Sequence, residues 1–396
     1  MAIGPKALVK PALLVWARDS AGFTIDDAAK NVTTPKKLAA WEADEGAPTM
    51  RQLRLLANKY KRPLSVFYLP GPPKDFQPLS DYRRLPGEIA GVLSRKLRYE
   101  IRIAQERRQL AIDLYDEIRE EPPAFTLRAT SKRDPEQLGL DIRKFLGVKL
   151  QQQTAWKETR IAYNTWRDLI EAKGVLVFQA TGVELREMRG FAVADDMVSI
   201  IAVNSRDSYS GRSFSLLHEL CHLALQKSGI SDFTQSNAHE DRPPEERQIE
   251  IYCNQVAAAT LMPKDLFLAE RLVEGNKGTP NWSDEDLSSL ARRFGVSQEA
   301  ALRRLLTFSR TTQAFYTAKR QEFQERYERQ AQIQKEQDGG PQWPIVVLSR
   351  IGPSLSRLIL QTYYRQRITL NDVSGYLGLK VPHIPKLEAA AYGRSL

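Results

Sequence analysis

The chain has 396 residues, of which 42% are hydrophobic and 27% charged, and a net charge of +10. This length suggests two or three domains with ample apolar material for buried cores. No apolar run approaches the ~18 residues of a membrane span, and the N-terminus lacks an uninterrupted signal-peptide apolar region. Two cysteines do not make a disulfide framework. We therefore expect a soluble cytoplasmic protein with no membrane partner. Its basic charge favours nucleic acid as a partner but can equally reflect solvated helices.

Residues 1–68 are predicted to form a bundle of short helices. The pattern indicates helices over 25–32 and 35–43, separated by a tight turn, with Lys36 and Lys37 at the start of the second. This is the layout of a helix-turn-helix, whose second helix enters the major groove of DNA. The first 75 residues carry 12 Lys and Arg against 7 Asp and Glu, which is half of the chain's net charge. A small helical bundle used for protein contacts is the alternative.

This segment resembles the XRE family of helix-turn-helix DNA-binding domains. The matching residues are Ala28-Ala29, Leu38, Trp41-Glu42 and Pro48-Thr49 through Leu56-Ala57. The resemblance implies that Thr34, Lys36 and Lys37 lie nearest the DNA and that Trp41 belongs to the core. It also implies an operator, such as the chain's own promoter, as a partner. Domains of this type usually act as dimers on paired half-sites, so a homodimer is expected.

Residues 69–88 contain five prolines, a density that predicts a stiff extended linker. Residues 93–120 form a long charged stretch whose default interpretation is a helix with a solvated face. Another amphipathic helix is predicted over 159–172.

Three short runs rich in β-formers follow, at 174–180, 190–194 and 198–204, and predict a small antiparallel sheet. An exposed strand can pair with the extended backbone of a peptide substrate. We nominate the last run for this role, with Ile200, Ala202 and Asn204 as its candidate residues. An ordinary interior strand fits the same residues equally well.

The most informative stretch is residues 213–225, which contain the sequence His218-Glu219-Leu220-Cys221-His222. The run is apolar and free of Gly and Pro, so it predicts a helix. Residues four apart share one face of a helix, so His218 and His222 can present two imidazoles to one Zn²⁺ with Glu219 beside the metal. The chain has only four histidines, and a chance occurrence of this pattern is expected roughly 0.002 times. A pair of helix histidines satisfied by hydrogen bonds is the structural alternative.

Such a site needs a third protein ligand, and the best candidate stretch is a second predicted helix that starts near Glu250 and stops at Pro263. Glu250, Cys253, Asn254 and Ala257 fall on one face of it. A carboxylate, an amide and small residues on one stripe would let the two helices approach closely.

His218-Glu219-x-x-His222, Glu250-x-x-x-Asn254-x-x-Ala257 and Leu261-Met262-Pro263 together resemble the ImmA/IrrE family of zinc metallopeptidases. The resemblance implies His218, His222 and Glu250 as ligands of Zn²⁺ and Glu219 as general base. It implies as substrate a repressor or a co-encoded partner protein, cut in stress, mobile-element or toxin-antitoxin regulation. The family usually has Gly at the position of Cys221 and Ala at that of Cys253.

The expected fold is therefore α+β and mostly helical. It comprises the helix-turn-helix bundle, a zincin-like metallopeptidase domain over 89–310 with its small sheet, and a helical C-terminal tail. The tail is divided into a long charged helix within 311–340 and a small helical unit over 341–396, because Gly339-Gly340-Pro341 marks a boundary.

Two functions remain open at this stage. The first is a DNA-associated, site-specific zinc endopeptidase. The second is a helix-turn-helix transcriptional regulator or antitoxin whose peptidase-like half binds a partner without cleavage. Glu219 favours the first, because a pure binding module has no need for a general base.

The two cysteines, Cys221 and Cys253, are each expected to flank the metal on facing helices. They could form a redox-sensitive pair or offer zinc an alternative ligand. Two small buried residues at a close helix crossing is the simpler explanation.

Overall fold

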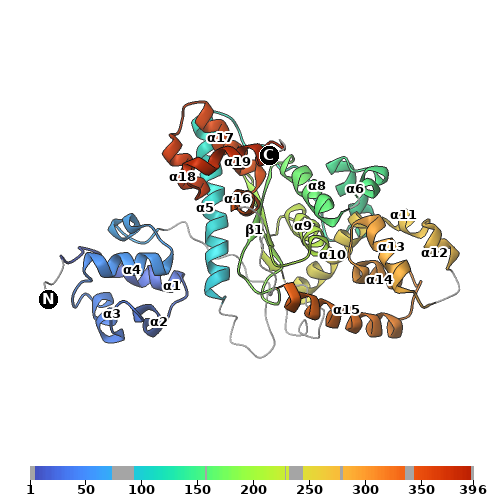
Figure 1. Ribbon diagram of the computed structural model, residues 1–396, viewed down its shortest axis with the longest axis horizontal. Helices are drawn as coiled ribbons and strands as arrows, with labels where there is room; N and C mark the ends of the chain where they lie inside the picture. The colour runs from blue at the N-terminus through green and yellow to red at the C-terminus, as the bar shows by residue number, and fades with distance from the viewer. Residues whose placement is uncertain are drawn as a thin grey trace. The chain divides into compact units, whose positions relative to one another are not determined.

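The computed structural model describes residues 5–73, 93–156, 158–227, 229–231, 244–276, 280–334 and 343–393 (Figure 1). Its contacts divide these residues into two units, which separate between Gln105 and Glu106. The fold is α+β and mostly helical, as predicted. Most of the predicted linker lies outside the described residues.

The N-terminal unit is a helical bundle around a compact apolar core. Its elements are α1 (Pro11–Ser20), α2 (Ile25–Ala29), α3 (Pro35–Glu42), α4 (Met50–Tyr60), the 3₁₀ helix η1 (Leu64–Tyr68) and the first part of α5 (Arg95–Ile118). Side chains of Thr24, Thr34 and Thr49 accept a backbone N–H at the starts of α2, α3 and α4. These caps satisfy amides that a helix start leaves without a partner. Leu38 and Trp41 of α3 are buried in the core.

The N-terminal unit extends further than predicted. Arg102 on α5 donates to the backbone oxygens of Tyr60 and Lys61, and the guanidinium of Arg95 stacks over the ring of Phe23. The predicted boundary at residue 68 leaves out the first turns of α5, which complete this bundle. The sequence predicts one continuous charged helix over this region. Nothing in its pattern indicates that the two units separate between Gln105 and Glu106.

The larger unit surrounds a four-stranded mixed sheet. Its strands are β1 (Val175–Ala180), β2 (Gly190–Val193), β3 (Ser199–Asn204) and β4 (Gly229–Ser231), in the order β1-β3-β2-β4. β1 and β3 are parallel, whereas β2 is antiparallel to both β3 and β4. The prediction of a purely antiparallel sheet was therefore wrong. The expected surface loop over 229–246 contains β4 and the start of a helix, and residues 232–243 lie outside the described part.

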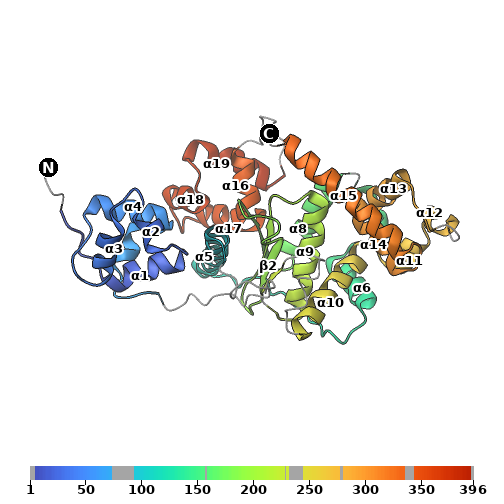
Figure 2. The same ribbon diagram turned by 90° about the horizontal axis from the view of Figure 1, so that it is seen from below.

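Helices cover the sheet and the site beside it. They are α6 (Pro135–Leu146), α7 (Leu150–Ala155), α8 (Thr159–Glu171), α9 (Tyr209–Ala224), α10 (Pro244–Leu261), α11 (Lys264–Leu268), α12 (Arg271–Gly275), α13 (Asp284–Phe294), α14 (Gln298–Thr307) and α15 (Gln313–Gln334). α9 packs on β2, β3 and α8 on one side and on α10 on the other. Figure 2 shows α6 alongside α10 and α15 beside α14.

The C-terminal helices are α16 (Trp343–Ile351), α17 (Pro353–Tyr364), α18 (Leu370–Leu377), the 3₁₀ helix η3 (Val381–His383) and α19 (Ile384–Ala391). They pack on the sheet as part of the larger unit, because α16 and α17 contact β1. Gly352, at φ +86°, lies so close to β1 that a Cβ atom there would overlap the backbone oxygen of Val177. The carboxylate of Glu171 accepts the backbone N–H and the hydroxyl of Ser354.

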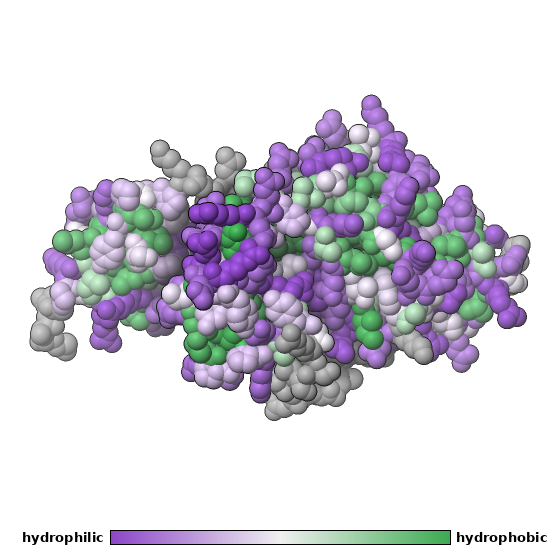
Figure 3. All heavy atoms as spheres, turned by 90° about the horizontal axis from the view of Figure 1, so that it is seen from above, coloured by the Kyte–Doolittle hydropathy of each residue, from purple (hydrophilic) through white to green (hydrophobic). Residues whose placement is uncertain are grey.

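No helix among the described residues is long and apolar enough to cross a membrane. Figure 3 shows polar and charged side chains over much of the face seen from above, with apolar side chains in patches between them.

Candidate metal centre

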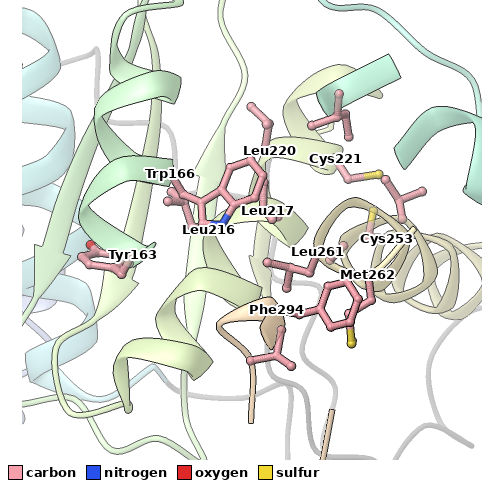
Figure 4. Close-up of a cluster of buried hydrophobic side chains, with 14 of the residues drawn as sticks. Tyr163, Trp166, Leu216, Leu217, Leu220, Cys221, Cys253, Leu261, Met262 and Phe294 are labelled. Carbon is pink, nitrogen blue, oxygen red and sulfur yellow. The ribbon is translucent and has the colours of Figure 1, made fainter. Parts of the chain in front are cut away.

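The helix that carries the two histidines is nearly all buried. α9 starts at Ser208, whose hydroxyl accepts the backbone N–H of Gly211, and every residue from Ser215 to Ala224 is buried. Its leucines pack into the main core with Trp166 of α8 (Figure 4). His218 and His222 lie one turn apart on this helix, so the predicted helical placement of the motif is confirmed.

Three potential ligand atoms converge between α9 and α10. The Nε2 atoms of His218 and His222 are 3.0 Å apart. Each lies 3.3 Å from a carboxylate oxygen of Glu250 on α10. Within the described residues these three side chains form the one cluster that could hold a metal ion, with ligand atoms within 4.8 Å of one another. Two imidazole nitrogens and a carboxylate form a donor set suited to a divalent transition metal.

Burial and neighbouring charges shift the pKa values of all three side chains in this cluster. Burial lowers the pKa of His218, so its imidazole is neutral. Burial also disfavours the charged form of His222, but the hydrogen bond and charge of Glu250 outweigh it and raise the pKa of His222 to about 9. The two imidazoles hold the pKa of the Glu250 carboxyl below its usual range in spite of its burial. Without metal, the triad therefore holds an imidazolium and a carboxylate, with one proton where a cation would bind.

Asn254 orients the first of the histidines. Its side-chain oxygen lies 3.0 Å from Nδ1 of His218, so it accepts the Nδ1–H proton. That tautomer leaves the Nε2 lone pair of His218 directed at the cluster. Asn254 is one turn from Glu250 on α10, so one helix face supplies both a ligand and the group that positions another ligand.

Buried polar side chains fix the end of α10. Arg143 on α6 donates to the backbone oxygen of Thr260, and Gln153 on α7 donates to that of Leu261. Arg304 on α14 donates to the backbone oxygen of Met262. These bonds satisfy carbonyls that a helix end leaves without intrahelical partners. The sequence offered no signal for them, because arginine in an amphipathic helix is normally solvent-exposed.

Glu219 lies against the start of β2. A Cβ atom on Gly190 would be 2.8 Å from Oε1 of Glu219 and 3.0 Å from its Cγ. Only glycine therefore leaves room for this carboxylate in its present position. The sequence pattern predicts Gly190 only as the first residue of a strand, and it does not indicate the contact with Glu219.

The centre is shielded from solvent in this conformation. His218 and Glu219 have no exposed surface, and His222 and Glu250 are 2% and 3% exposed. A peptide carbonyl can therefore reach the cluster only after the surrounding chain moves.

The nominated substrate strand is not available. β3, which carries Ile200, Ala202 and Asn204, is hydrogen-bonded to β1 on one side and β2 on the other. The side chain of Asn204 is also buried and donates to the backbone oxygens of Val183 and Met188. The substrate-strand hypothesis was wrong, because an interior strand has no backbone groups left for a third strand.

The residues predicted to lie nearest DNA are at the start of α3 in the N-terminal unit. Thr34, Lys36 and Lys37 are all exposed there, and Thr34 caps the helix by accepting the backbone N–H of Lys37. They remain predictions, since exposure does not identify a partner.

Cys221 and Cys253 are both buried, and their side chains face each other between α9 and α10 (Figure 4). Burial raises the pKa of Cys253 well above its usual range.

We predict that Asn254→Ala lowers divalent-metal affinity by about 10- to 100-fold, because His218 loses the partner that sets its tautomer. Asn254→Asp keeps an oxygen acceptor for Nδ1–H and should retain most of the affinity. Competition with a chromophoric chelator measures both. Equal losses in the two variants would contradict the positioning role.

The metal affinity should also depend on pH. Below about pH 9, His222 holds a proton that the metal must displace. Affinity should therefore rise with pH, by up to about tenfold per unit, and level off above pH 9. Titrations from pH 6 to 9 measure this slope. In Glu250→Gln the carboxylate that raises the pKa of His222 is gone, so the weaker affinity of that variant should level off at lower pH. A wild-type affinity that does not change over this range would contradict the assignment.

Part of the chain that contains this cluster resembles a known protein family. No curated protein was found to match the chain. Residues 170–306 match the family model of the IrrE N-terminal-like domain, which is peptidase family M78. The matched residues contain His218, Glu219, His222 and Glu250, whereas the N-terminal bundle and the C-terminal helices lie outside them. Residues 170–306 are therefore similar to the IrrE N-terminal-like domain of peptidase family M78, and they contain a cluster that is compatible with metal binding.

Proposed function

We propose that the protein is a DNA-associated, site-specific zinc metalloendopeptidase of the cytoplasm. The observation that carries this proposal is the convergence of His218, His222 and Glu250 beside Glu219, inside a domain of peptidase family M78. Two imidazoles and one carboxylate form the ligand set of thermolysin-type catalytic zinc sites, which leave a position open for water.

Zinc bound by the triad would supply a water of lowered pKa and polarise the scissile carbonyl. The chain's own residues do the rest. Glu219 follows His218 directly and accepts the proton of the attacking water at its carboxylate, then gives it to the leaving amine. Asn254 keeps the Nδ1–H tautomer of His218 through the cycle. Gly190 provides the space in which the Glu219 carboxylate stays beside the cluster.

The proposed substrate is a repressor or another protein encoded beside this one, cleaved in stress, mobile-element or toxin-antitoxin regulation. This part rests on the sequence resemblance to ImmA/IrrE peptidases. The N-terminal unit supports a link to DNA, since α2 and α3 are joined by a short turn and Lys36 and Lys37 are exposed on α3. We propose that it binds an operator or the chain's own promoter, as a homodimer on paired half-sites.

A second candidate is a regulator or antitoxin that binds a partner through the M78 domain without cleaving it. One observation favours it: the ligands and Glu219 are buried. On this reading the metal would stabilise a binding surface, and Glu219 would have no chemical task.

Glu219→Gln separates the two candidates. We expect it to reduce cleavage by at least about 100-fold, because the general base is lost, while zinc affinity stays within a few-fold of wild type. The measurement is intact-mass analysis of the neighbouring encoded proteins after incubation with the zinc-loaded enzyme. Glu285→Gln, on the exposed surface of α13, is the matched control and should cleave normally. Regulation in cells that survives Glu219→Gln unchanged would favour the non-cleaving regulator.

Lys36→Ala combined with Lys37→Ala tests the DNA interface. If both lysines contact phosphates, the slope of log affinity against log salt should fall by about 1.8, since each contact contributes ~0.9. Titration of fluorescent promoter DNA at several salt concentrations measures the slope. Lys264→Ala, an exposed lysine of the larger unit, should leave it unchanged. Identical slopes for the double variant and wild type would contradict the placement of the interface on α3.

A further inference from the structure

The only two cysteines of the chain lie together. A buried residue contacts roughly 6 to 12 others, so two cysteines placed at random in a chain of 396 residues would touch in only about 2–3% of cases. Both thiols have no exposed surface, and their side chains face each other in Figure 4. Both belong to the same cluster of buried side chains, on two helices that pack against each other. This contact is unlike the scattered placement expected of two unrelated small core residues.

The thiols also adjoin the residues of the metal centre. Cys221 directly precedes His222 on α9. Cys253 directly precedes Asn254, which holds His218, and lies one turn after Glu250 on α10. A bond between the two sulfurs would therefore join the two helices that supply all three ligand candidates.

We propose that Cys221 and Cys253 form a disulfide between α9 and α10 when a hydroperoxide reaches them, and that this disulfide and metal binding oppose each other. The existence of the disulfide is independent of the proposed function, whereas its coupling to the metal rests on the proposed zinc site.

The chemistry balances with hydrogen peroxide as the oxidant. One thiol sulfur attacks a peroxide oxygen, the O–O bond breaks, and water leaves with the thiol proton, which produces a sulfenic acid. The second sulfur attacks the sulfenic sulfur, the S–O bond breaks and a second water leaves. The two thiols are oxidised by two electrons and the peroxide is reduced. The second thiol faces the first across the two helices, so it is placed to complete this step.

The disulfide and the metal oppose each other because they require different positions of α9 and α10. Closing the bond brings the two sulfurs to about 2 Å, which is shorter than any non-bonded contact. Metal–ligand distances in proteins keep within about 0.2 Å of their typical values. A shift of this size beside His222 and Asn254 disturbs the ligand set, and by linkage a bound metal must resist the shift equally.

Burial protects the thiols at rest, which is normally a sign of inert cysteines. Here the ligands are buried as well, between the same two helices. A local opening that admits a substrate to the metal centre therefore also gives a small peroxide access to the thiols.

The experiment uses the full chain, first freed of metal with a chelator and then treated with increasing hydrogen peroxide. Met197, whose side chain is 54% exposed, serves as an internal reference for oxidation. We expect a mass loss of about 2 Da that dithiothreitol reverses, with a Cys221–Cys253 cross-link in the peptide map, before Met197 gains oxygen. Cys221→Ala and Cys253→Ala are matched controls and should lose no mass. Oxidation of Met197 while both thiols stay free would overturn the disulfide.

The coupling is tested by repeating the treatment with zinc, after zinc binding has been measured directly. Zinc should slow formation of the disulfide at least several-fold. At equilibrium in a thiol–disulfide buffer, zinc should disfavour the disulfide by the same factor by which oxidation weakens zinc binding. Equal oxidation rates with zinc demonstrably bound would overturn the coupling and leave the disulfide intact. Failure to bind zinc at all would instead contradict the proposed function, while the metal-free result would still decide whether the disulfide forms.

Discussion

The close packing of α9 on α10 is the constraint on which the rest of this centre depends. It brings two histidines of one helix within 3.3 Å of a carboxylate on the other. A buried carboxylate is costly unless a positive charge compensates it, and here the charge resides on His222 or would reside on a metal ion. The carboxylate of Glu250 and the two imidazoles are therefore matched in charge.

Much of the larger unit maintains that packing. At Gly139 on α6 an added Cβ atom would lie 2.7 Å from Cβ of Ala259, so these two helices approach at backbone distance. Arg143, Gln153 and Arg304 bind consecutive carbonyls at the end of α10 from three different helices. α10 is therefore held by close packing of small residues and, at its end, by buried donors. Because the helix is fixed, the position of Glu250 on it is fixed as well.

The parts that could be predicted from sequence are those whose geometry is local. Helical spacing alone places His218 and His222 on one face, and the same argument puts Glu250 and Asn254 one turn apart. The order of strands in a sheet depends on pairing between residues that are far apart in the sequence. Alternating apolar residues do not reveal that β3 is paired on both sides or parallel to β1, so the substrate strand was misplaced and the sheet misdescribed. Gly190 and Arg143 act through residues distant in sequence, and neither has a local signature.

The arrangement around Glu219 bears on the choice between enzyme and regulator. A protein that used the triad only to bind metal could place any small apolar residue after His218. Burying a carboxylate there would destabilise the fold through desolvation and would serve no function. Instead β2 begins with a residue that has no side chain at the point where the Glu219 carboxylate lies. The charge of this carboxylate also helps to raise the pKa of His222, so it acts on the ligand set directly. A carboxylate given space beside a metal-compatible triad is what general-base chemistry requires.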